Sequence, residues 1–182
     1  LLSFANFDDT DAYGLELSAN YRIAKWWRAN ASLDFYSQSQ KGIVNYKEAN
    51  ERTTDVKTNV FNSRISNSFT ATKNLRFQLF AMYRGGQDGI QFNSKSMWMI
   101  NTGASLRVLK GKGNLTLRVN DIFKGMRFAF DAETPFTQNG QFNWESQSAY
   151  IGFNYRFGGG KNKAKSRRRR DNNEKQGSGG FI

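Results

Sequence analysis

The sequence predicts an all-β fold, an antiparallel transmembrane β-barrel, and three observations support this prediction. Apolar residues recur at every second position in several segments of the chain. Aromatic residues make up 15% of the chain, although its mean hydropathy is negative, at −0.70. Short and long polar connections alternate between the segments. These features are typical of a barrel whose strands present an apolar face to lipid and a polar face to the lumen.

The period-two alternation predicts seven strands and part of an eighth. In residues 13–23, six apolar side chains fall on one face, and the other face carries Gly14, Glu16, Ser18, Asn20 and Arg22. An α-helix cannot place six apolar residues at a strict period of two. The other strands are predicted at 27–35, 61–71, 75–84, 98–108, 115–123 and 149–157, with an incomplete strand at 1–5.

The connections between these strands are sorted by length. Short turns are predicted near 24–26, 72–74 and 110–113, and long polar loops at 37–55, 85–95 and 131–141. Outer-membrane barrels have short turns in the periplasm and long loops outside. We therefore expect residues 1–157 to form the membrane domain, with the last strand ending in the periplasm.

Aromatic side chains occur near both ends of the predicted strands. Rings favour the boundary between lipid and water, so we interpret them as two membrane-interface girdles. The alternative is a soluble sheet with scattered aromatic residues, which strands also favour. The interface residues that we predict are Trp26 and Trp27 at the short-turn side, and Phe35, Tyr83 and Trp98 at the long-loop side.

The composition argues against catalysis. The 182 residues include no cysteine and no histidine, which removes thiol nucleophiles, zinc clusters and the commonest general base. Carboxylates gather at Asp8, Asp9 and Asp11, and again at Glu48, Glu51 and Asp55. We interpret them as solvated charge in outer loops. The alternative is that these carboxylate oxygens bind Ca²⁺. We expect no enzymatic activity, no cofactor and no metal.

Residues 158–182 differ from the rest of the chain. They hold eight Lys or Arg against Asp171 and Glu174, and therefore carry +6 of the total charge of +12. Glycine and charge without apolar periodicity predict a disordered tail, which we expect in the periplasm. We interpret Arg167, Arg168, Arg169 and Arg170 as solvated charge, and a docking site for a periplasmic or peptidoglycan partner is the alternative. Nucleic acid is not an expected partner.

Two stretches resemble known outer-membrane proteins. The sequence AYIGFNYRF at 149–157 resembles the closing strand that barrels present to the barrel-assembly machinery, although 25 residues follow it here. Such a strand is recognised by edge addition, with alternate side chains in pockets. These side chains are Ala149, Ile151, Phe153, Tyr155 and Phe157. The second stretch, GNLTLRVNDIFKGMR at 113–127, resembles a segment near the end of TonB-dependent receptor barrels.

In that second stretch we expect Asp121 to lie on the strand and to pair with a lumen arginine such as Arg118. The whole carboxy-terminal arrangement resembles the TonB-receptor-like outer-membrane proteins of the Bacteroidetes type. The resemblance implies a barrel of twenty-two strands with an internal plug, of which these seven or eight strands are the last third. It also implies insertion by the barrel-assembly machinery, contact with outer-membrane lipid and lipopolysaccharide, and coupling to TonB through an amino-terminal part.

The leading functional hypothesis is a TonB-dependent-receptor-like transporter for a nutrient too large for porins. The rival is a barrel of the same descent without a plug, acting as a structural or accessory subunit of an assembly, secretion or lipoprotein complex. Its partner would be a surface lipoprotein or a periplasmic protein bound by the tail. A third hypothesis is a small, self-closed barrel of eight strands, because that number suffices for a filled interior.

Overall fold

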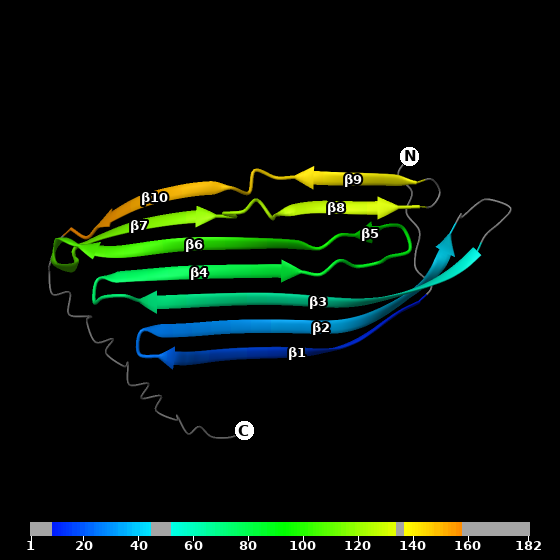
Figure 1. Ribbon diagram of the computed structural model, residues 1–182, viewed down its shortest axis with the longest axis horizontal. Helices are drawn as coiled ribbons and strands as arrows, with labels where there is room; N and C mark the ends of the chain where they lie inside the picture. The colour runs from blue at the N-terminus through cyan, green and yellow to red at the C-terminus, as the bar shows by residue number, and fades with distance from the viewer. Residues whose placement is uncertain (1–8, 45–51, 134–136, 158–182) are drawn as a thin grey trace, which may run out of the picture.

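The computed structural model describes residues 9–44, 52–133 and 137–157, and Figure 1 shows their arrangement. The predicted strand at 1–5 and the basic tail at 158–182 lie outside the described residues. Within the described ranges the chain consists of antiparallel strands and one short 3-10 helix, η1 (Leu109–Gly111). No helix in these ranges is long and apolar enough to span a bilayer.

The main element is a seven-stranded antiparallel sheet in a single layer (Figure 1). Its neighbours along the sheet follow the order of the chain, so each strand pairs with the next main strand. The strands are β1 (Asp9–Ala24), β2 (Trp27–Val44), β3 (Arg52–Thr70), β4 (Leu75–Arg84), β6 (Met97–Val108), β7 (Gly113–Asn120) and β10 (Ser148–Tyr155). Among the described residues this sheet is not closed, because β1 and β10 are its two edges.

A second sheet of three strands extends the first at one end. It contains β5 (Asn93–Ser94), β8 (Arg127–Ala132) and β9 (Gln138–Asn143) in the order β5-β8-β9. In Figure 1, β8 continues the line of β7, and β9 that of β10. We call this the long-loop end, and the opposite end, where β1–β2, β3–β4 and β6–β7 are joined, the short-turn end.

The three short turns lie where the sequence predicts them. Lys25 and Trp26 join β1 to β2. In the β3–β4 turn, Thr72 Oγ1 accepts hydrogen bonds from the Asn74 and Leu75 backbone N–H groups, at 3.2 and 3.0 Å. Such hydroxyl contacts favour a turn over a continued strand. The β6–β7 turn contains η1, where Gly111 has a φ of 88° that suits glycine.

The prediction of long loops at 37–55 and 131–141 is wrong, because most of these residues belong to strands. The β2–β3 ladder runs without interruption from Trp27↔Phe69 to Val44↔Arg52. Likewise, β8 and β9 pair from Arg127↔Asn143 to Ala132↔Gln138. Polar side chains on both faces hide the alternation in these parts, but the backbone hydrogen bonds of a ladder do not depend on it. Of the third predicted loop, residues 93–94 form β5.

The cross-strand register separates apolar from polar side chains over the central part of the main sheet. On one face, Leu15 lies opposite Phe35, which lies opposite Phe61. On the other face, Glu16 lies opposite Asp34 and Asp34 opposite Asn62. Most apolar side chains on the first face are exposed, for example Leu15 at 60% and Ile151 at 72%. A single layer whose apolar face is uncovered needs an apolar solvent, and a lipid bilayer provides one.

Candidate functional site

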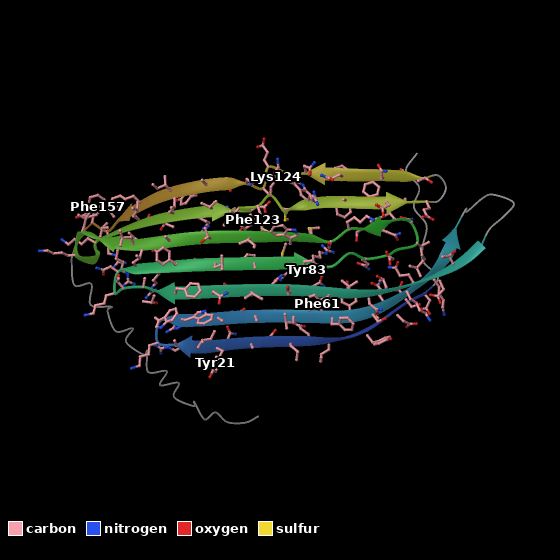
Figure 2. All side chains as sticks on the ribbon, in the orientation of Figure 1. Tyr21, Phe61, Tyr83, Phe123, Lys124 and Phe157 are labelled. Atoms are coloured by element: carbon pink, nitrogen blue, oxygen red, sulfur yellow. The ribbon has the colours of Figure 1, made fainter. Side chains whose placement is uncertain are left out.

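Aromatic side chains form clusters near both ends of the apolar face. Near the short-turn end, the rings of Trp26, Trp27 and Phe69 form a mutual cluster, with ring centroids 5.7 to 6.2 Å apart. The Trp27 indole N–H also donates a 2.9 Å hydrogen bond to Asn67 Oδ1. Toward the long-loop end, Phe61 and Tyr83 lie side by side at 6.2 Å, as Figure 2 shows.

The spacing of these clusters is close to that of a membrane. Trp27 and Phe35 are eight residues apart on β2. A rise of about 3.4 Å per residue makes that separation about 27 Å along the strand. A tilt of about 40° reduces the height to roughly 20 Å, close to the apolar band of about 25 Å in outer-membrane barrels. The assignment of Trp26, Trp27, Phe35, Tyr83 and Trp98 to the membrane interface stays a prediction.

The polar face carries a pocket of about 790 Å³ near the middle of the sheet. One row of cross-strand partners crosses its floor, from Glu16 on β1 through Asp34 and Asn62 to Arg84 on β4. The Asn62 amide donates a 3.0 Å hydrogen bond to Asp34 Oδ2. In the next row, Arg64 adds a second guanidinium group to the pocket wall.

The rest of the pocket wall is largely apolar. Met82 and Met97 come from β4 and β6, and Met126 and Trp144 come from the connections beyond β7 and before β10. Sequence reasoning did not identify these residues as a group. A usable indication was the presence of Met82 at a position where the strand alternation expects a polar side chain. No sequence pattern indicates that Met126 and Trp144 reach the same pocket.

The connection between β4 and β6 folds over the polar face beside this pocket. The Asp88 N–H donates a 3.2 Å hydrogen bond to Thr58 Oγ1, and the Gln87 amide donates one of 2.7 Å to Gln38 Oε1. Thr58 and Val60 on β3 are consequently buried, with Val60 only 2% exposed. The connection therefore narrows the space over the polar face on the long-loop side.

The expected pair of Asp121 with Arg118 is wrong. Asp121 lies beyond the end of β7 with a φ of 44°, and its buried carboxylate accepts hydrogen bonds from the N–H groups of Gly125 (2.9 Å) and Met126 (3.1 Å) and from the Ser146 hydroxyl. The positive φ turns the carboxylate toward its own turn and away from the strand. In the described ranges the one ion pair joins Lys95 to Asp131, at 2.5 Å.

This turn attaches the second sheet of three strands to the main sheet. The Asp121 N–H donates a 2.8 Å hydrogen bond to Asn101 Oδ1, and the Ile122 N–H donates one of 2.9 Å to the Ile100 carbonyl. Phe123, which Figure 2 labels, lies between β7 and β8, and its ring centroid is 6.0 Å from that of Trp98. Phe123 is thus a turn residue, although the sequence alternation placed it on a strand.

Comparison with protein families matches residues 1–155 to the outer membrane protein beta-barrel family. The match covers most of the 182 residues. The chain belongs to the outer membrane protein beta-barrel family. Comparison with the curated proteins found no match, and comparison with the solved structures found none either.

Membership in the outer membrane protein beta-barrel family explains the uncovered apolar face and places the protein in the outer membrane. The predicted closing strand is β10, which carries Ala149, Ile151, Phe153 and Tyr155, and Phe157 is the second residue after its end. Among the described residues β10 pairs with β7 alone, and its other edge is unpaired. Recognition of this edge by the assembly machinery stays a prediction. Arg167, Arg168, Arg169 and Arg170 lie outside the described residues.

The two carboxylate groups considered as calcium ligands are only partly described. Asp8, Glu48 and Glu51 lie outside the described residues. Asp9 and Asp11 are on β1, and Asp55 on β3 accepts a 2.7 Å hydrogen bond from the Ser39 hydroxyl. In the ranges that the structure describes, no three acidic side chains come together as a metal site would need.

Proposed function

We propose that this chain forms part of the wall of an outer-membrane transporter for a polar nutrient, of the TonB-dependent-receptor-like kind. The observation that carries the proposal is the concave pocket of about 790 Å³ on the polar face, which is lined by four charged side chains together with three methionines and Trp144. Concave sites with a few convergent polar groups are typical of small-molecule binding.

In this proposal the short-turn end faces the periplasm and the long-loop end faces outward, as in other outer-membrane barrels. Solute would enter from the long-loop end, pass the β4–β6 connection and reach Glu16, Asp34, Arg64 and Arg84. The plug and TonB would supply the energy coupling, as the resemblance to TonB-dependent receptors implies. The tail at 158–182 would lie in the periplasm, where its charge favours anionic surfaces.

The proposal is tested on the native protein extracted from outer membrane. Intact mass and amino-terminal sequencing are expected to show a plug-like domain ahead of residue 1 of this sequence. Uptake of polar solutes by cells that carry the protein is then expected to stop when TonB is removed. Cells that carry an insertion-competent variant with the plug deleted provide the control for passive leakage.

The opposite results support the accessory role. They are a large barrel without a plug, no TonB-dependent uptake, and copurification of partner proteins that dissociate when residues 158–182 are deleted. A mature protein that starts within a few residues of Leu1 would instead indicate a small, self-closed barrel.

A further inference from the structure

The charges in the pocket on the polar face are separated by sign. Glu16 and Asp34 lie directly opposite one another on β1 and β2. Arg84 follows on β4 beyond Asn62, and Arg64 lies in the next row of β3. With neighbouring strands about 4.8 Å apart, the backbones of Asp34 and Arg84 are about 10 Å apart. The pocket therefore has a negative and a positive side.

The described residues leave most of this charge without a partner of opposite sign. Glu16, Asp34, Arg64 and Arg84 take part in no ion pair within the described ranges, and Asp34 is contacted by the neutral amide of Asn62. Two like charges directly opposite in a sheet destabilise it. A cation between Glu16 and Asp34 would remove this repulsion, and an anion would do the same for the two arginines.

The apolar part of the pocket wall lies beside and beyond the arginines, on the side away from Glu16 and Asp34, because Met97 on β6 pairs with Arg84. Met82, Met97 and Met126 have flexible, polarizable side chains, which adapt to ligands of different shape. Trp144 adds a flat aromatic surface. A neutral sugar would use the aromatic ring but would leave both pairs of charges without a partner, so the charge pattern favours a ligand that carries both signs.

We propose that this pocket binds a short peptide as a zwitterion, an inference that rests on the proposed function as a transporter. The terminal amino group lies between Glu16 and Asp34, the terminal carboxylate lies at Arg64 and Arg84, and the side chain next to that carboxylate contacts the methionines and Trp144. An extended chain spans about 3.4 Å per residue, so a gap of about 10 Å corresponds to about three residues.

The inference is tested by calorimetric titration of the full-length protein in detergent with the tripeptide Ala-Leu-Ala. The same peptide is also used with an acetylated amino terminus and with an amidated carboxy terminus. The free peptide is expected to bind, and each block is expected to weaken binding by about tenfold or more, because each removes a charge-assisted contact. This comparison needs no variant, so it does not depend on the folding of a mutant.

Variants then assign the two sides of the pocket. The double variant Glu16→Gln, Asp34→Asn is expected to bind free and acetylated peptide equally, while it still discriminates against the amidated form. Arg64→Gln, Arg84→Gln is expected to show the converse pattern. Arg118→Gln is the matched control, because Arg118 also lies on the polar face but outside this pocket. It is expected to leave all three affinities unchanged.

Equal affinity of the wild-type protein for the free and both blocked peptides would overturn the inference, as would no binding of the free peptide. Uptake measurements on the same protein separate this result from the proposed function. TonB-dependent uptake of other solutes without peptide binding overturns the inference alone. Peptide binding with the predicted variant pattern but without uptake supports the pocket and contradicts the transporter.

Discussion

At the scale of single residues, the Asp121 carboxylate accepts three hydrogen bonds that fix the backbone around it. Its carboxylate holds the turn after β7 through Gly125 and Met126, and it holds the segment before β10 through Ser146. The positive φ is uncommon outside glycine, although Asp and Asn tolerate it better than other residues. An alternation pattern could not predict this role, because it depends on backbone conformation and on a residue 25 positions away.

Replacing Asp121 by alanine is expected to lower the free energy of unfolding by about 3 kcal/mol, because three donors lose a buried charged acceptor. Denaturant unfolding of the protein in lipid vesicles measures the change. Asp121→Asn is expected to cost less, since it keeps one acceptor oxygen and tolerates the positive φ. Asp55→Ala is the control: it removes one exposed hydrogen bond from Ser39, so it is expected to cost less than about 1 kcal/mol. Equal losses for Asp121→Ala and Asp55→Ala would contradict this account.

At the scale of elements, the alternation of apolar and polar residues identified those parts of the strands that have one apolar and one polar face. All seven main strands were predicted from residues such as Leu15 and Glu16, which lie on opposite faces of β1. The alternation did not reveal the part of β2 at the long-loop end, because there the polar Ser37, Ser39 and Lys41 lie on the same face as the apolar Leu33 and Phe35. Water on both sides of a hairpin removes the need for alternation. Residues of the pocket floor could be assigned to the lumen face, but Met126 and Trp144 depend on connections that have no periodicity.

The packing of the β8–β9 hairpin depends on Phe130, whose ring covers Gly140. Phe130 lies opposite Gly140 and is stacked on Phe142 at 6.3 Å, and a Cβ at Gly140 would collide with its ring. Gly140→Val is therefore expected to displace Phe130 and to increase protease cleavage of residues 127–143 several-fold, while the rest of the sheet stays protected. Gln138→Val is the control on the same strand, because it adds a β-branched residue without meeting the ring. Equal cleavage of the two variants would argue against this packing.

At the scale of the whole molecule, the two faces of one sheet meet different solvents. Leu17 and Ser18 are neighbours near the middle of β1 and point to opposite faces. An arginine facing lipid at the bilayer midplane costs about 2–4 kcal/mol, whereas one facing the lumen costs little. Leu17→Arg is therefore expected to reduce the fraction of protein folded in the outer membrane, and Ser18→Arg is not. Heat-dependent gel mobility measures that fraction, and equal loss in both variants would contradict the assignment of faces.

The pairing of each main strand with the next one in the chain has a consequence for how the sheet forms. The turns between β1 and β2, β3 and β4, and β6 and β7 are short, so closing them costs little chain entropy. Of the other three connections, the one between β4 and β6 contains β5 and the one between β7 and β10 contains β8 and β9, and this structure shortens them in effect. The sheet can therefore grow one hairpin at a time, each strand templating the next, without a search for partners distant in the chain.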